Sequence, residues 1–139
     1  MATQFEGPIS GQLEIELFES GSSYPVTIIR LDQEFLMRAT LRLESTQEII
    51  KLDRPRKIEQ LTANFFLESL GPGSSYTLTS GPESWKTGKK IYEFQVSLPS
   101  EKLGIGIFKV TAVVTGIDDQ GQPLPIAWYQ DGPVFQTYA

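Results

Sequence analysis

Apolar and polar residues alternate with a period of two along most of this 139-residue chain. In the segment EFLMRATLRL, for example, every second residue from Phe35 to Leu43 is apolar, and the residues between them include Arg38 and Arg42. Successive side chains of a β-strand point to opposite faces, so the pattern predicts strands with one face in a core and the other in water. The clearest such segments are 11–18, 34–43, 90–99 and 107–115.

Weaker patterns predict further strands. They lie at residues 24–30, 61–70, 75–80 and 132–138. Pro25 favours an edge position for the first of these, because proline cannot donate to a central ladder. Segment 45–53 stays open between a short helical turn and an extended crossover, since Ser45 and Glu48 have the spacing of a capping box.

The spacing of these segments indicates the fold class. Turn-forming glycine, proline, serine and aspartate residues separate them at regular intervals, and no segment shows a sustained period of 3.6. We therefore predict an all-β fold: an antiparallel β-sandwich of seven to eight strands, with a barrel as the second possibility. We expect residues 1–139 to form a single domain.

A resemblance makes the sandwich more specific. The segment YEFQVSLPSEKLGIGIFKVTAVV contains a strand, a loop and the pattern G-x-[aromatic]-x-V-x-A-x-V, with Phe108 as the aromatic residue. It resembles the E strand, corner and F strand of immunoglobulin-like domains, and the resemblance covers residues 90–138 best. There is no cysteine pair, and Phe65 or Phe66 would stand where those domains carry a buried tryptophan. The resemblance implies an immunoglobulin-like sandwich, and binding more often than catalysis.

Composition narrows the chemistry. The chain has no cysteine and no histidine, which excludes disulfides, thiol nucleophiles, imidazole bases and imidazole metal ligands. We therefore expect a protein that is not an enzyme and needs no cofactor or metal. The net charge of −5 does not favour nonspecific binding to nucleic acid or to an anionic membrane.

The sequence also bears on location. The start, MATQFEGPISGQ, has neither a basic region nor an apolar run, so it does not read as a signal peptide. No apolar stretch has the length of a membrane span. We expect a cytoplasmic protein with no membrane partner.

Residues 115–133 collect three carboxylates between the last strands. Asp118 and Asp119 stand in IDDQGQP, where aspartate, glycine and proline all favour a turn. A calcium loop would place ligands at alternating positions and end on a glutamate, which is absent here. We interpret this stretch as a hairpin turn. Partner contact is a further possibility, because binding residues concentrate on loops.

The C-terminal segment carries the candidate binding residues. Trp128 and Tyr129 are adjacent, so on a strand they point to opposite faces, and one of them should be exposed. Tryptophan and tyrosine are enriched at interaction hot spots. Asp131 precedes Gly-Pro and would bend or bulge the strand. We select Trp128, Tyr129, Asp131 and Phe135 as partner-binding residues, with Trp85 second.

Three other groups of residues can each be interpreted as a functional site or as an ordinary structural feature. Trp85, with Tyr76 and Glu83, could stack on a sugar, or Trp85 could cap the core. Glu14 and Glu16 share a strand face at a spacing that carboxylate hydrolases use, but alternating glutamates on a solvent face are ordinary. The basic run at 54–57 reads as a solvated loop.

We therefore expect a non-catalytic protein-interaction or structural module that acts through the aromatic C-terminal strand and a sheet edge. Its partner is another protein or a second copy of the chain, and no nucleic acid is expected. A carbohydrate or small-ligand binding module is the alternative, and a carboxylate-based hydrolase is the third hypothesis.

Overall fold

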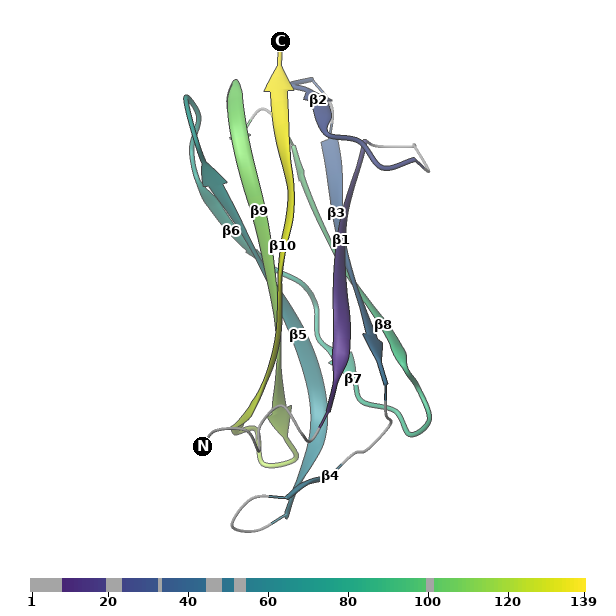
Figure 1. Cartoon of the computed structure of the whole chain (residues 1–139). Coiled ribbons are helices and arrows are strands. Elements are labelled where there is room, and N and C mark those ends of the chain that lie inside the picture. Colours follow the sequence, from purple (N-terminus) through teal and green to yellow (C-terminus); the bar gives the residue numbers. More distant parts are fainter. Residues whose placement is uncertain (1–8, 20–23, 33, 45–48, 52–54, 100–101) are drawn as a thin grey trace.

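A computed structural model describes residues 9–19, 24–32, 34–44, 49–51, 55–99 and 102–139 (Figure 1). None of these residues lies in an α-helix, which confirms the all-β class. The described residues form ten strands: β1 (Gly11–Glu19), β2 (Ile28–Arg30), β3 (Glu34–Leu43), β4 (Ile49–Lys51), β5 (Pro55–Ser69), β6 (Tyr76–Thr79), β7 (Glu83–Ser84), β8 (Ile91–Pro99), β9 (Gly106–Asp118) and β10 (Pro123–Tyr138).

The number of strands exceeds the predicted seven to eight. The two additional strands, β4 and β7, are three and two residues long, too short to show a period of two. Within segment 45–53, residues 49–51 form β4 and pair with β5, whereas 45–48, 52 and 53 lie outside the described residues. The described part of this segment is therefore extended.

The strands form two sheets that lie face to face (Figure 1). The three-stranded sheet has the order β1-β3-β8, and the seven-stranded sheet has the order β2-β10-β9-β5-β4, with β6 and β7 also paired to β5. All pairings but one are antiparallel; β2 runs parallel to the C-terminal end of β10. The expectation of purely antiparallel sheets is thus wrong at this edge, because the chain crosses to the second sheet after β1 and enters it beside β10 in the same direction.

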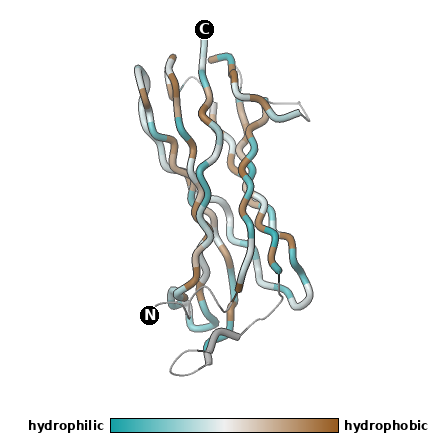
Figure 2. Tube along the Cα trace, viewed as in Figure 1, coloured by the Kyte–Doolittle hydropathy of each residue, from teal (hydrophilic) through white to brown (hydrophobic). Residues whose placement is uncertain are grey.

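One hydrophobic core lies between the sheets, and its residues come from both. Strand β9 alternates between buried positions and partly or fully exposed ones along its whole length, as the sequence pattern predicts. Hydrophobic and hydrophilic residues are interspersed along the strands of both sheets (Figure 2). The ring centroids of Phe35 on β3 and Phe135 on β10 are 5.6 Å apart, and Phe108 on β9 is 5.4 Å from Phe135. These three rings join the two sheets.

The upper end of the molecule in Figure 1 is closed by a tight backbone contact. A Cβ atom on Gly106 would lie 1.8 Å from the carbonyl oxygen of Pro72, so only glycine fits at the start of β9. The side chain of Thr137 accepts a hydrogen bond from Gly106 N, at 2.9 Å. The loop before β6 is thereby held against the end of the β9–β10 pair.

Candidate functional site on the C-terminal strand

The stretch with three carboxylates separates into two places with different roles. Asp118 ends β9 and closes the turn to β10: its Oδ1 accepts hydrogen bonds from the backbone N–H groups of Gln120 and Gln122, at 2.9 and 2.8 Å. Gly121 has φ of 77°, which an L side chain rarely adopts. The predicted hairpin turn is confirmed, and it spans only residues 119–122 because both strands are longer than the sequence indicated.

A residue from the basic run completes this turn. Arg56, on β5, donates from Nε and Nη2 to Asp118 Oδ2, at 2.9 and 2.8 Å, and from Nη2 to the carbonyl oxygen of Pro123, at 2.8 Å. The backbone hydrogen bond from Gln122, followed by the contact with Arg56, lowers the pKa of Asp118 below its ordinary value. Arg56 is therefore a structural residue rather than part of a solvated loop.

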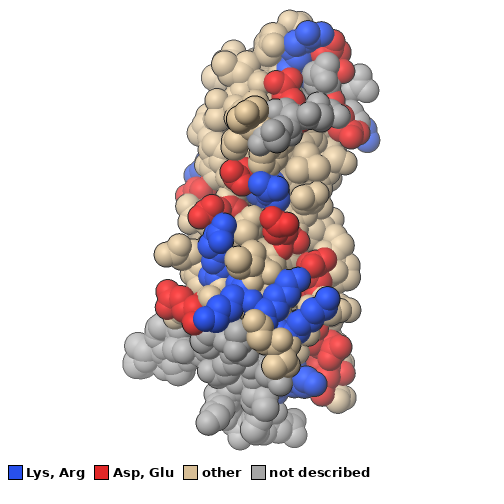
Figure 3. Space-filling view, turned by 90° about the vertical axis from the view of Figure 1, so that its right-hand side faces the viewer, with Lys and Arg blue, Asp and Glu red and all other residues tan. Residues whose placement is uncertain are grey.

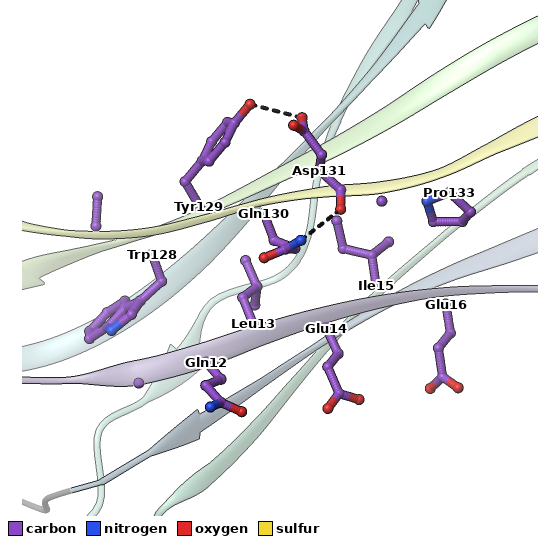
Figure 4. Close-up of a pocket in the computed structure, with 13 residues that line it drawn as sticks. Gln12, Leu13, Glu14, Ile15, Glu16, Trp128, Tyr129, Gln130, Asp131 and Pro133 are labelled. Atoms are coloured by element: carbon purple, nitrogen blue, oxygen red, sulfur yellow. Dashed lines mark hydrogen bonds between the residues drawn. The ribbon is translucent and has the colours of Figure 1, made fainter.

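Trp128 and Tyr129 point to opposite faces of β10, as predicted. Trp128 is 7% exposed and belongs to the core, whereas Tyr129 is 61% exposed. In Figure 4 the Trp128 ring lies on the side of β10 that faces β1, and Tyr129 extends from the other side. Only Tyr129 of this pair offers its ring to a partner.

A β-bulge follows at Gly132 and Pro133. Asp131 pairs with Thr111 and Val134 with Lys109, so two residues of β10 stand opposite the single residue Val110 of β9. A Cβ atom on Gly132 would lie 2.6 Å from Val110 Cγ1 and 3.1 Å from Ile15 Cγ2, so glycine is needed where β10 approaches β1. The predicted bulge is confirmed, and the ladder resumes beyond it.

The bulge also changes which residues of β10 are buried. Before it, the even-numbered residues Leu124, Ile126 and Trp128 face the core; after it, the odd-numbered residues Phe135 and Thr137 do. Phe135 is 1% exposed, so the expectation that its ring contacts a partner is corrected to a core role. The extra residue reverses the alternation and turns Phe135 inward.

Trp85 is likewise internal. Its backbone N–H donates to the carbonyl oxygen of Glu59, at 2.9 Å, directly after the short β7, and its ring stacks on Tyr92 with centroids 5.5 Å apart. The side chain is 9% exposed, and its Nε1 has no hydrogen-bond partner among the described residues. A sugar-stacking platform needs an exposed ring, so the structure corrects that reading of Trp85 and gives it the core-capping role.

An exposed polar network surrounds Tyr129. The Tyr129 hydroxyl donates to Asp131 Oδ1 at 2.8 Å (Figure 4), the Thr111 hydroxyl donates to the same atom at 3.2 Å, and Lys109 Nζ lies 3.5 Å from it. The hydrogen bond from Tyr129 is the main reason that the pKa of Asp131 is lowered, and the same bond raises the pKa of Tyr129. The network fixes the orientation of the exposed ring.

The seam between β1 and β10 forms a shallow groove of about 750 Å³ on the edge of both sheets (Figure 4). Leu13 and Ile15 lie between the two strands, and Glu14 and Glu16 point away from β10. Glu16 Oε1 lies 3.0 Å from Arg38 Nη2, and Glu14 Oε1 lies 3.9 Å from Arg42 Nε. The two glutamates are thus paired with arginines of β3 on the outer face of the three-stranded sheet. Among the described residues, no group of three or more acidic side chains is placed to hold a metal ion.

The outer faces of the two sheets differ in chemistry. Over the three-stranded sheet, lysine and arginine are interspersed with aspartate and glutamate (Figure 3). The described residues include ten large hydrophobic side chains that are exposed, and eight of them lie on, or directly next to, β2, β5, β9 and β10 of the other sheet. These eight, called the apolar face below, are Ile28, Phe66, Leu70, Ile105, Ile107, Tyr129, Val134 and Tyr138.

Strand pairing brings these residues together. Gln136 pairs with Ile28 on one side and Ile107 on the other, and Leu70 donates its N–H to Ile107 O, so one row crosses four segments. Val134 occupies the next outward row, opposite Lys109, and Tyr129 lies opposite Val113, beyond the row of Asp131 and Thr111. Among the eight residues of the apolar face, the sequence analysis selected only Tyr129. The other positions alternate with core residues, as ordinary solvent-exposed residues do. One feature of the sequence could have revealed this face. Its outward strand positions carry isoleucine, valine and phenylalanine, whereas the outward positions of the other sheet carry charged residues.

Comparisons with known proteins add little. No family model and no curated protein matches the chain. An X-ray structure of a Northeast Structural Genomics Consortium target covers 97% of this chain and 89% of its own, at 9% identity and a TM-score of 0.37. A β-glucosidase from Listeria innocua in complex with glucose covers 91% of this chain at 9% identity and a TM-score of 0.40, and the match spans 16% of that enzyme. Likeness at this level carries no argument about function. No helix among the described residues is long and apolar enough to cross a bilayer.

Proposed function

We propose that this chain is a non-catalytic interaction module that binds a protein partner through the apolar face. The observation that carries the proposal is the gathering of eight of the ten exposed large hydrophobic side chains on one sheet. A monomer rarely exposes a contiguous apolar patch larger than about 300–600 Å², and larger ones mark interaction sites. Scattered exposed residues would not need this explanation.

Tyr129 is the anchor of the proposed surface. It is the most exposed residue of the apolar face, at 61%, and tyrosine is enriched among hot-spot residues. Its hydroxyl is already bonded to Asp131, so the ring loses little freedom when a partner covers it. Trp128 and Phe135 contribute from beneath by fixing the position of β10 in the core.

We also infer an immunoglobulin-like arrangement of the two sheets. In that fold one sheet contains strands A, B and E, and the other contains C, F and G. The orders β1-β3-β8 and β5-β9-β10 agree with this division, if β8 and β9 are the E and F strands that the sequence resembles. Phe65, fully buried on β5, then takes the place of the tryptophan of the C strand.

The proposed function is tested by affinity capture from a lysate of the source organism. The wild-type chain is compared with Tyr129→Ala and with Tyr24→Ala, where Tyr24 is an even more exposed tyrosine (77%) outside the apolar face. We expect a specific partner to be retained by wild type and Tyr24→Ala and lost with Tyr129→Ala. Equal retention by all three chains would contradict the proposal, provided that circular dichroism shows all three to be folded.

A further inference from the structure

We infer that the partner of the apolar face is a second copy of the same chain, which meets it face to face about a two-fold axis. The inference rests on the proposed function, since it names the occupant of that surface. A two-fold contact uses the same patch on both copies, so the patch must be large enough and complementary to itself.

The size of the face fits a dimer contact. Its eight side chains are 40–61% exposed. With roughly 150–250 Å² for a fully exposed large side chain, the face offers on the order of 700 Å². A stable protein–protein contact of standard size buries about 800 Å² on each partner. One copy of this chain can therefore supply the area that a second copy needs, without a contribution from the charged sheet.

The charges at the centre of the face alternate in sign, because Lys109 on β9 pairs with Glu68 on β5 and forms an ion pair with Asp131 on β10. Lys109 and Asp131 belong to neighbouring strands between Tyr129 and Val134, and Lys109 Nζ lies 3.5 Å from Asp131 Oδ1. A two-fold axis that lies in the contact plane and passes between these two charges, at right angles to the line that joins them, places the lysine of each copy opposite the aspartate of the other. At this ion pair two copies can thus meet without like charges facing each other, which would cost free energy at the centre of a contact.

The shape of the surface is also suitable. The apolar face is one side of a hydrogen-bonded sheet formed by β2, β10, β9 and β5, and sheets pack on one another through interdigitating side chains at a spacing of about 10 Å. The opposite outer face carries the ion pairs Arg38–Glu16 and Arg42–Glu14. Homodimer contacts contain few charged residues in their core, so that face is less suitable for a dimer contact.

The test is the mass of the chain in solution across a concentration series, by light scattering after size exclusion. We expect wild type to reach twice the chain mass at high concentration. Ile107→Glu should weaken association at least tenfold, because it places a carboxylate in the contact. Ile91→Glu is the matched control: Ile91 has the same residue type and nearly the same exposure (47% against 46%) but lies on β8 of the other sheet. Circular dichroism and thermal unfolding check that both variants are folded.

A second measurement does not depend on an introduced charge. Because the chain has no cysteine, Gln136→Cys reports on the apolar face and Gln95→Cys on the exposed outer face of β8. We expect the rate of labelling by a bulky maleimide to fall several-fold with rising protein concentration at position 136 and to stay constant at position 95. Protection at 95 alone, or disruption by Ile91→Glu alone, would place association at β8 and overturn the inference.

The outcomes separate the inference from the proposed function. If wild type is monomeric at every concentration and both cysteines react at constant rates, self-association is excluded. Capture of a different protein that is retained by wild type and Ile91→Glu but lost with Ile107→Glu would then still support the proposed function. If capture is the same for all three chains, the apolar face is not a binding surface and both proposals fail.

Discussion

At the scale of single residues, Asp118 shows how a turn can depend on a distant strand. Its two carboxylate oxygens are divided between the backbone of the β9–β10 turn and the guanidinium of Arg56. The local part of this arrangement follows from the sequence, since aspartate commonly binds backbone N–H groups two residues on. The partner 62 positions away could not be predicted, because nothing in the sequence pairs Arg56 with Asp118 rather than with another carboxylate.

The lowered pKa of Asp118 leads to a prediction about acid stability. A carboxyl group whose pKa is lower in the folded state contributes stability above its unfolded pKa and loses that contribution as the pH falls through its folded pKa. We expect Asp118→Asn to reduce the free energy of unfolding at pH 7, and the difference from wild type to shrink in the acidic range below about pH 4. Urea unfolding at a series of pH values measures this.

Asp119→Asn is the control, because Asp119 is an exposed neighbour in the same turn. It should leave the stability curve close to that of wild type. Parallel curves for wild type and Asp118→Asn at all pH values would contradict the assignment.

Gly106 gives a second prediction at this scale. An alanine there would place its Cβ against the carbonyl oxygen of Pro72, which must shift together with its loop. We expect Gly106→Ala to lower the free energy of unfolding by about 1–3 kcal/mol, the usual cost of overpacking. Gly81→Ala, whose Cβ would meet no atom within 4 Å, should be neutral. Chemical denaturation compares the two, and equal stabilities would show that the loop adapts without strain.

At the scale of elements, the bulge in β10 divides one strand into two halves with opposite alternation. Regular alternation correctly predicted the buried faces of β3, β5 and β9, because those strands keep one register with their partners across the core segment. The role of Phe135 could not be predicted in the same way, since one additional residue reverses the inward positions and the length of a bulge is set by its partner strand. The Asp-Gly-Pro sequence indicates where the bulge lies.

This division predicts the effect of a deletion. Removing Gly132 would leave Pro133 alone opposite Val110 and restore regular pairing, with Val134 still opposite Lys109 and with Phe135 and Thr137 still facing the core. We therefore expect the deletion to cost less free energy of unfolding than Phe135→Ala, which should cost about 3–5 kcal/mol. Guanidinium unfolding of both variants tests this. A deletion variant less stable than Phe135→Ala would mean that the bulge itself is required where β10 approaches β1.

At the scale of the whole molecule, the two outer faces are chemically unequal, with ion pairs on one side and the apolar face on the other. The two-sheet architecture could be predicted, because alternating strands separated by turns must bury one face each. The chemical difference between the two outer faces could not be predicted, because it depends on cross-strand neighbours that are distant in sequence, such as Ile107 beside Gln136.

Association through the apolar face has a predicted thermodynamic signature. We expect it to persist when the salt concentration rises from about 0.1 M to about 1 M, since screening weakens contacts between charges and not between apolar groups. The heat capacity change of association should be negative, as expected for buried apolar surface. Calorimetric dilution at the two salt concentrations and at several temperatures measures the salt dependence and the heat capacity change. Dissociation by salt would instead indicate contacts through the charged outer face of the three-stranded sheet.

The parallel pairing of β2 with β10 also has a mechanical consequence. It is bounded by two hydrogen bonds, from Gln136 N to Thr27 O and from Leu31 N to Tyr138 O, both 2.8 Å long. A stretching force applied to the chain just before β2 and just after β10 pulls these two strands in opposite directions along their common axis. The hydrogen bonds between them are then loaded together in shear and cannot open one at a time. The short pairing of β2 with β10 therefore resists mechanical extension of the chain between these two strands.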